Sequence, residues 1–588
     1  MSTGIWDTKL FQRQFKLDRE KQRKFESRIG CLQLLFNLFV VLLLIYLFLV
    51  QVFDIRSYRD RAKSQRASTP FVLRGEIVDR NNVKLAADDT SFNVYAHPKY
   101  YDNTPEELAL KLQPFLNIDK QTLISKFARD ESVILIKKGI DRKTAEKIKA
   151  LGLREISLEV KNKRIYPQGS LAAHILGYYN ADADMAGGIE YIAGDYLKYI
   201  DKSFQYEKMP NGDIIYNLSV DPEDVIIPAK GKTLKLTIDS PIQHICEKYL
   251  YKMVQKTNAY RGAAIVMEPK TGEILALAAY PYYNPNNYQK HTLLDMKNWA
   301  LTDVYPPGST FKIITIASAF LNNKINKNTK IMDTGKMKVG WWEIQNYDYR
   351  EKGAPGLIDL VYLFQHSSNI GSVKVAQMMS DEEFYDALQM FGFGQRTGID
   401  LPGESTGLLP KPSLWDVSTH ASMGYGYGAS VTAIQMISAV NAIANNGVWV
   451  TPHVIKYSDE QAEQKIVKRR IMTNEQAQEI KELLVDSIEA GHSLGKMEDY
   501  TIAAKTGTSR RPNDNGAGYS NKLYTSMIGF LPASDPKVTI YVVIDSPQGG
   551  ELWGSTVAGP VFKDIATEIV RIMNINPDKP KNVNKNSL

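Results

Sequence analysis

The chain has 588 residues, of which 44% are hydrophobic and 23% charged, a balance typical of chains that fold into packed cores. Its net charge of +7 comes from 72 basic and 65 acidic residues, which argues against a dedicated nucleic-acid binder with basic charge concentrated on one face. The two cysteines, Cys31 and Cys246, exclude a disulfide framework and a cysteine-rich zinc site.

An apolar segment near the N-terminus determines the predicted topology. Residues Ile29 to Phe53 are almost entirely Leu, Val, Ile and Phe, and as a helix they would be about 37 Å long, enough to span a bilayer. The run continues into Asp54 without a small-residue cleavage site, which favours an uncleaved anchor over a signal peptide. More basic residues precede the span than follow it, so residues 1–28 are predicted to be a cytoplasmic tail. Everything after Phe53 is then predicted to lie outside the cytoplasmic (inner) membrane.

Residues 54–230 mix short strand-like runs with charged helical stretches such as Thr104–Leu116, and they show no pattern typical of a catalytic pocket. Turn residues around Pro210–Asp213 and Pro228–Gly231 indicate a domain boundary near residue 230.

Residues 231–573 show strands at both ends and helices between them. The predicted strands are Thr233–Ile238, Ala263–Met267, Glu273–Leu277, Ser526–Leu531 and Val538–Ile544, and the predicted helices include Pro241–Gln255 and Val561–Met573. This order predicts an α/β (α+β) domain with an antiparallel sheet flanked by helices. The polar tail 574–588 is predicted to be disordered.

The first motif with catalytic chemistry is Pro307-Gly308-Ser309-Thr310-Phe311-Lys312, which leads into an apolar helix. Ser309 and Lys312 are three residues apart, so on a helix they lie on one face, one turn from each other. Because a serine hydroxyl is a poor nucleophile without an adjacent base, this spacing predicts Ser309 as nucleophile and Lys312 as general base. Pro307 and Gly308 mark a helix start, where the helix dipole stabilises developing negative charge.

Two further motifs follow along the chain. Ser367-Ser368-Asn369 offers the Ser367 hydroxyl for proton relay and the Asn369 amide for positioning substrate or the catalytic lysine. Lys505-Thr506-Gly507-Thr508 follows an extended segment, and its glycine permits close backbone approach of a peptide. Lys505 is predicted to attract a carboxylate, and Thr508 to supply a backbone donor to an oxyanion.

Each of the three motifs also has a chance counterpart elsewhere in the chain. Serine and lysine three residues apart recur at Ser493–Lys496 and Ser534–Lys537, but the first contains a glycine and the second a proline. Ser91-Phe92-Asn93 repeats the second motif, and Lys270-Thr271-Gly272 is better interpreted as a hairpin turn. Only Ser309, Ser367 and Lys505 combine all three motifs in the order nucleophile, middle loop and strand.

That constellation is typical of penicillin-binding proteins and serine β-lactamases. The whole chain resembles a class B penicillin-binding protein, with a short tail, a single anchor, a mixed, elongated pedestal (dimerisation-type) domain at 54–230 and a transpeptidase domain at 231–573. Within the pedestal, the segments that resemble class signatures are Arg74–Arg80, Arg164–Pro167, Ala173–Tyr178 and Gly187–Glu190. Structural ion pairing is the favoured interpretation of Arg74, Asp79 and Glu190.

Several segments are similar to the septal, cell-division transpeptidases of this class. They are Asn298–Asp303, Ser367–Asn369, Leu401–Ser405 and Gly424–Gly428 with Val431-Thr432. Elongation-type relatives usually carry Ser-Cys-Asp in the middle motif, whereas a sporulation-specific relative would share the features seen here. Pro306 departs from the acidic residue that is common in division enzymes and puts the local loop geometry in doubt.

The resemblance implies a peptidoglycan D,D-transpeptidase that forms an acyl-serine intermediate and is the target of penicillin-type β-lactams. Lys505 and the Thr506 and Thr508 hydroxyls would bind the donor carboxylate, and Gly507 would belong to the same substrate-binding segment. The backbone amides of Ser309 and Thr508 would form the oxyanion hole. No metal or cofactor is implied. Expected partners are stem peptides, a polytopic glycosyltransferase and other division-complex membrane proteins. A D,D-carboxypeptidase, a β-lactamase and a non-catalytic membrane scaffold remain alternatives.

Overall fold

The structure, a computed structural model, describes residues 8–52, 67–68, 72–181, 183–198, 206–208, 214–215, 229–491, 496–513 and 518–579. The chain divides into two compact units, residues 1–72 with 200–229 and residues 73–199 with 230–588. Phe53, the last residue of the predicted anchor, lies outside the described residues, as does Ser493 of the first alternative serine–lysine pair.

The first unit contains helix α1 (Thr8–Val52), within which Glu26–Leu49 is long and apolar enough to cross a membrane. Its apolar side chains are uncovered: Leu34 is 70% exposed and Phe36 is 65% exposed. A helix with this apolar surface fits a single-pass membrane anchor. The same unit has a three-stranded antiparallel sheet of β1 (Ala67–Ser68), β9 (Tyr206–Lys208) and β10 (Ile214–Ile215).

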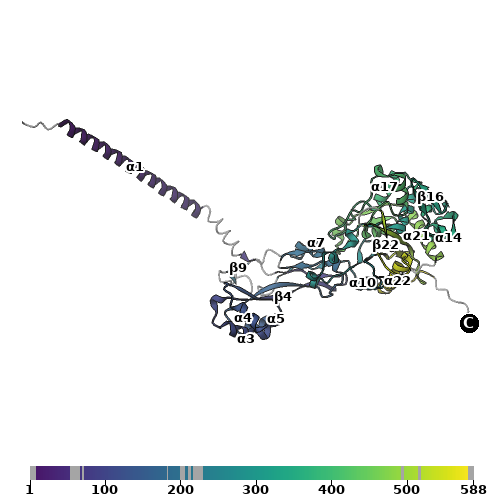
Figure 1. Ribbon diagram of the computed structural model, residues 1–588, viewed down its shortest axis with the longest axis horizontal. Helices are drawn as coiled ribbons and strands as arrows, with labels where there is room; N and C mark the ends of the chain where they lie inside the picture. The colour runs from purple at the N-terminus through teal and green to yellow at the C-terminus, as the bar shows by residue number, and fades with distance from the viewer. Residues whose placement is uncertain are drawn as a thin grey trace, which may run out of the picture. The chain divides into compact units, whose positions relative to one another are not determined.

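The N-terminal part of the second unit is built on the long strand β4. The strands of its sheet run in the order β12–β3–β4–β5, with β6 paired to β4; their bounds are β3 (Ile77–Val78), β4 (Lys84–Ala96), β5 (Ile134–Ile140), β6 (Ile156–Ile165) and β12 (Leu234–Lys235). Helices α3 (Pro105–Leu116), α4 (Lys120–Phe127) and α5 (Arg142–Ala150) lie beside β4 (Figure 1). Thr104 and Glu107 form a capping box at the start of α3, which explains why the helix begins where the sequence predicts.

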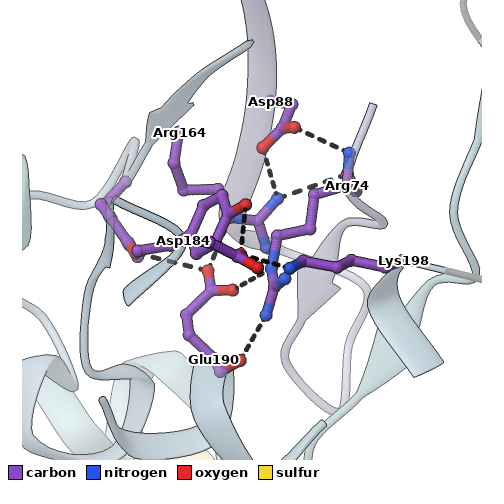
Figure 2. Close-up of polar contacts among 8 residues, drawn as sticks. Arg74, Asp88, Arg164, Asp184, Glu190 and Lys198 are labelled. Atoms are coloured by element: carbon purple, nitrogen blue, oxygen red, sulfur yellow. Dashed lines mark hydrogen bonds and ion pairs between the residues drawn. The ribbon is translucent and has the colours of Figure 1, made fainter. Parts of the chain in front are cut away.

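A buried ion-pair network joins distant segments of this region (Figure 2). Glu190 accepts hydrogen bonds from Arg74 Nε and Arg164 Nε, both at 2.6 Å, and Arg164 also pairs with Asp88 at 3.0 Å. All four side chains are almost completely shielded from water, so each charge requires its partners. The network therefore supports the structural interpretation of Arg74 and Glu190 made from sequence. Asp79 instead accepts hydrogen bonds from Asn81, Val83 and Ser240.

Close to this network are three short helices and two short strands. They are α6 (Ala173–Leu176), β7 (Tyr179–Asn180), β8 (Met185–Ala186), α7 (Gly188–Ile192) and α8 (Gly194–Leu197). Gly177 and Gly188 both have positive φ, and a Cβ on either would meet backbone atoms at 1.9 and 2.6 Å respectively. Only glycine permits this close approach of the two segments.

The C-terminal part of the second unit has a five-stranded antiparallel sheet, in the order β14–β13–β23–β22–β21. Its strands are β13 (Arg261–Met267), β14 (Ile274–Tyr280), β21 (Ala503–Pro512), β22 (Tyr519–Leu531) and β23 (Val538–Asp545). Both faces are covered, because Ala263 and Ile265 pack in one core whereas Ala264 and Val266 pack in another. This explains why the strands read as continuous apolar runs.

Helices complete the two cores. On one face, α10 (Ser240–Thr257) and α22 (Gly554–Ile572) lie side by side (Figure 1). On the other face, α13 (Lys312–Leu321) and α19 (Ala433–Ala444) are buried almost throughout. The predicted antiparallel sheet flanked by helices is confirmed.

The remaining described elements outside the active site are β2 (Val72–Leu73), η1 (Pro98–Tyr100), β11 (Ala229–Lys230), η2 (Pro285–Lys290), α11 (Leu293–Met296), α12 (Trp299–Thr302), α15 (Leu360–Gln365), α17 (Asp381–Met390), η4 (Pro412–Leu414), α18 (Val417–Gly424), β19 (Val448–Val450), α20 (Asp459–Lys465), β20 (Lys468–Arg470) and α21 (Asn474–Ala490).

The structure differs from the sequence predictions at two places. The strand predicted at Thr233–Ile238 shortens to β12, which pairs in parallel with β3 of the N-terminal sheet rather than with the catalytic sheet. The tail predicted to be disordered from Asn574 is partly fixed, since Asp578 accepts hydrogen bonds from Thr501 N and Ser534 Oγ at 2.7 Å each. Residues 580–588 lie outside the described residues, and the domain limits 54–230 and 231–573 stay a prediction.

Candidate active site

The predicted nucleophile lies in a tight turn that precedes a buried helix. Ser309 is the second residue of the 3₁₀ turn η3 (Gly308–Phe311), and Lys312 begins α13 directly after it. The Lys312 backbone N–H donates to Ser309 O, so the two residues are one turn apart, as the spacing predicts. Ser309 is partly exposed, whereas Lys312 is completely buried.

Glycines bring this turn against strand β21 and the loop after α18. Gly308 has φ +57°, and a Cβ there would lie 2.8 Å from Ser509 Cβ. Gly507 also lies close to the turn, since a Cβ on it would meet Thr310 N at 3.2 Å. Gly308 N also donates to Gly426 O at 3.0 Å. The Lys-Thr-Gly-Thr strand and the nucleophile turn are therefore in direct contact.

The side-chain amine of Lys312 is held by the middle motif. Its Nζ donates to Asn369 Oδ1 at 2.8 Å and to Ser367 Oγ at 3.2 Å, and it also donates to Ser367 O. Among the described contacts, none joins Lys312 Nζ to Ser309 Oγ. Burial and the nearby Lys505 charge hold the pKa of Lys312 well below its usual range, partly offset by Asp333. This environment favours the neutral amine, the form that is able to accept a proton.

The middle motif is positioned by side chains that the sequence analysis did not identify. Asp333, at the end of β15 (Lys330–Asp333), accepts hydrogen bonds from Ser368 Oγ at 2.5 Å and from Asn346 Nδ2 at 2.9 Å. Asn346 Oδ1 in turn accepts from the backbone N–H groups of Asn369 and Ile370, at 2.9 and 3.1 Å. These bonds fix the start of α16 (Asn369–Ala376). β15 pairs with β18 (Gly356–Asp359).

A hairpin that ends directly before Asn346 also contacts Asn369. Its strands are β16 (Lys336–Val339) and β17 (Trp342–Gln345), and α14 (Tyr349–Lys352) follows shortly after it. Gln345 O accepts a hydrogen bond from Asn369 Nδ2 at 2.9 Å. Neither Asp333, Gln345 nor Asn346 belongs to a recognisable motif, so only the folded structure could reveal them.

Ser367 adopts a backbone conformation that is unusual for serine. Its φ is +52°, in the left-handed region that serine rarely occupies. Such strain persists only where surrounding contacts impose it, and it concentrates at functional sites. Here the Lys312 contact and the Asn369 helix start on either side account for it.

Lys505 lies buried on β21, and desolvation lowers its pKa to about 8. Its Nζ donates to Thr506 O at 2.9 Å. Thr508 Oγ1 accepts a hydrogen bond from Gly554 N at 2.9 Å, and this bond does not use the hydroxyl proton of Thr508. The fold thus brings all three motifs together, and it places Lys270-Thr271-Gly272 in the predicted turn between β13 and β14.

Comparisons with known families agree with this geometry. Residues 262–567 match the family described as penicillin binding protein transpeptidase domain, and residues 71–222 match the penicillin-binding protein dimerisation domain.

Individual relatives cover most of the chain. Stage V sporulation protein D of Bacillus subtilis is 32% identical over 86% of this chain and 79% of its own length. The probable peptidoglycan D,D-transpeptidase PenA of Neisseria meningitidis is 32% identical, over 88% and 87%. Peptidoglycan D,D-transpeptidase FtsI of Buchnera aphidicola is 31% identical, over 93% and 95%.

Solved structures share the fold. Penicillin binding protein 2X from Streptococcus thermophilus superposes with a TM-score of 0.70 and 24% identity, over 87% of this chain and 81% of that chain. A peptidoglycan synthetase from Bifidobacterium adolescentis gives a TM-score of 0.67 and 24% identity, over 88% and 98%.

Proposed function

The chain belongs to the class B penicillin-binding proteins, and from that membership we propose how its own residues perform the reaction. It is a serine-type D-Ala-D-Ala transpeptidase of peptidoglycan, a family whose members bind penicillin-type β-lactams. The observation that carries the residue assignment is the buried Lys312 amine, one turn after Ser309, with a pKa well below its usual range.

In the first half of the cycle, Ser309 Oγ attacks the penultimate D-Ala carbonyl of a donor stem peptide. Lys312 Nζ accepts the hydroxyl proton, and the carbonyl oxygen becomes an oxyanion facing the backbone N–H groups of Ser309 and Thr508. The peptide C–N bond then breaks. The proton passes from Lys312 through the Ser367 hydroxyl, 3.2 Å away, to the amine of the departing D-Ala.

In the second half, an amine from a neighbouring stem peptide attacks the acyl carbonyl of Ser309. The same relay removes the proton of this amine and returns it to Ser309 Oγ as the ester bond breaks. Asn369 keeps the Lys312 amine in place, while Lys505 with the Thr506 and Thr508 hydroxyls binds the carboxylate of the donor. Gly507 allows the peptide backbone to approach β21.

Fluorescent penicillin tests the nucleophile. We expect the full-length protein in detergent to form one stable adduct, which maps by mass spectrometry to Ser309. Ser309→Ala should abolish labelling, whereas Ser534→Ala in the alternative serine–lysine pair should leave it unchanged. An adduct on another residue would overturn the assignment. Rapid release of the adduct by hydrolysis would favour a β-lactamase, and release of D-Ala without cross-links would favour a carboxypeptidase.

We also propose that the enzyme acts in septal wall synthesis. The likeness of Gly424–Gly428 to septal enzymes supports this, and Gly426 in that segment contacts the nucleophile turn. A relative named FtsI and a sporulation protein both resemble the chain over most of their lengths. A fluorescent fusion at mid-cell in growing cells would support the division role, and recruitment only to developing spores would support the alternative. Failure of Ser309→Ala to complement excludes a purely structural scaffold.

A polytopic glycosyltransferase and other division-complex membrane proteins are the proposed partners. The contact surfaces would be α1, with Gln33 and Asn37 in its apolar stretch, and the N-terminal domain. Polar side chains in a membrane helix hydrogen-bond to neighbouring helices. In this proposal the N-terminus is cytoplasmic and the catalytic domain is outside. Asn37→Leu should weaken co-purification of such a partner, whereas Cys31→Leu in the same helix should not.

A further inference from the structure

The hairpin β16–β17 ends in two adjacent tryptophans that almost nothing covers. Trp341 is 95% exposed and Trp342 is 70% exposed. Gly340 has φ +57° and is the first of two residues between the paired Val339 and Trp342, as a type II′ turn requires. Trp341 is therefore at the tip of a defined turn, in which a large apolar side chain serves no local structural need.

The body of the same hairpin is firmly packed. Val339 and Ile344 are buried in a small core with Ile370, Val373 and Ala421 of helices α16 and α18. Trp342 is on the same face as Val339, because directly paired residues of an antiparallel hairpin share a face. It nevertheless extends beyond the buried part of this face, so the exposed indoles are held by a rigid support.

The base of the hairpin is part of the active site. Gln345 O binds Asn369 Nδ2, and Asn346 Oδ1 binds the backbone N–H of Asn369. Trp342 is three residues before Gln345, about 10 Å along an extended strand. A stem peptide of four extended residues covers at most about 14 Å. The sugar to which a bound stem peptide is attached therefore lies within reach of the tryptophans.

The surroundings of the tip fit an anionic polysaccharide. Lys336 and Lys338 are exposed on the outer face of β16, and Glu343 is the acid on the facing strand. The hairpin thus carries one net positive charge beside two flat apolar rings. Figure 1 shows β16 near the outer edge of the C-terminal part of the second unit.

We propose that Trp341 and Trp342 form a stacking platform for the glycan strand of peptidoglycan, next to the site that reacts with its stem peptides. This inference rests on the proposed function for the identity of the polymer. The indoles pack against the apolar faces of the sugar rings, and Lys338 attracts the carboxylates of neighbouring stem peptides. The platform holds the polymer while successive stem peptides enter the active site, so it raises the affinity for polymer without changing the chemistry at Ser309.

The test uses the full chain in detergent and two probes. The first probe is purified glycan strands from which an amidase has removed the peptides, and the second is fluorescent penicillin. We expect the double variant Trp341→Ala/Trp342→Ala to bind the glycan strands about tenfold more weakly, a loss typical of buried aromatic contacts in interfaces. Its rate of acylation by penicillin should equal that of the wild type.

Two further variants separate the possible outcomes. Trp341→Tyr/Trp342→Tyr retains the flat rings and should restore most of the binding, whereas Tyr191→Ala, which removes a 63% exposed aromatic from α7, should have no effect. Unchanged glycan binding by the double alanine variant overturns the proposal, as does an equal loss of penicillin acylation. Loss of binding to a membrane partner with intact glycan binding would assign the tip to a protein instead. Absence of penicillin acylation in the wild type would refute the proposed function and not the platform.

Discussion

The Lys312 amine is removed from water and faces a second cation, Lys505, so protonation is unfavourable in the folded protein. In the unfolded chain the same amine has an ordinary pKa near 10.4. Between the lowered native pKa and this unfolded pKa, the unfolded state binds more protons than the native state. The free energy of unfolding therefore rises with pH across that window, because of Lys312. Burial of Lys312 thus destabilises the fold at pH 7, and it also makes the amine a usable base.

Lys312→Met should therefore stabilise the fold and abolish catalysis. Methionine has a similar length and carries no charge to desolvate. About 1 kcal/mol shifts Tm by roughly 2–4 °C in a domain of 150–250 residues and by less in a larger one, so we expect Tm to rise by about 1–2 °C. Calorimetry measures the stability, and fluorescent penicillin labelling measures activity. A fall in Tm would mean that the lost hydrogen bonds to Ser367 and Asn369 outweigh the desolvation.

Lys505 predicts an alkaline limit on acylation. Its pKa of about 8 means that the amine loses its charge above that pH, and with it the attraction for the carboxylate of a penicillin. We expect the second-order acylation rate constant to fall as pH rises through about 8. In Lys505→Arg, whose guanidinium stays charged, this fall of the rate constant at alkaline pH should disappear, even if the absolute rate is lower. If the rate constant of the variant falls at the same pH, the titrating group is not Lys505.

Among the elements, the start of α16 is the one on which the site depends. Asn346 caps it from a different element, and Ile370 N is buried, so removal of the Asn346 amide leaves donors unsatisfied. Asn346→Ala should cost about 1–3 kcal/mol of stability. It should also slow acylation at least about tenfold, because Asn369 would lose the hydrogen bond that holds its backbone in place.

The matched control for this element is Asn326→Ala, which removes an exposed asparagine that only forms a local turn with Asn328. It should leave both the acylation rate and the urea midpoint close to those of the wild type. If both variants acylate normally, Asn346 has no part in positioning the middle motif.

At the scale of the whole molecule, the Arg74–Glu190–Arg164 network connects segments that are up to 116 residues apart (Figure 2). Glu190→Gln removes the carboxylate that pairs with two buried guanidinium groups. Removal of one partner of a buried ion pair typically lowers the free energy of unfolding by about 3–5 kcal/mol. Urea unfolding should show a clear fall in midpoint. Glu146→Gln, which breaks an exposed pair with Arg142, should change stability by less than about 0.5 kcal/mol. Equal effects of the two substitutions would contradict the structural role of the network.

Local chemistry in the sequence was sufficient for much of this protein. Hydrophobic length identified the apolar part of α1, continuous apolar runs and turn residues identified the hairpin of β13 and β14, and Thr104 marked the start of α3. The three motifs were predicted as one site because each combines a reactive side chain with the backbone context that its role requires. Each of these signals is contained in one short continuous segment, so it can be recognised without the fold.

Tertiary structure alone decided the rest. It placed β12 in the N-terminal sheet, attached Asp578 to Thr501, and gave Lys312 its partners Ser367 and Asn369. Asp333 and Asn346 hold the middle motif from positions more than 20 residues away in sequence. Such contacts depend on which surfaces pack together, and no local periodicity encodes that choice. The shifted pKa of Lys312 has the same origin, since it arises from burial and from Lys505, 193 residues further along the chain.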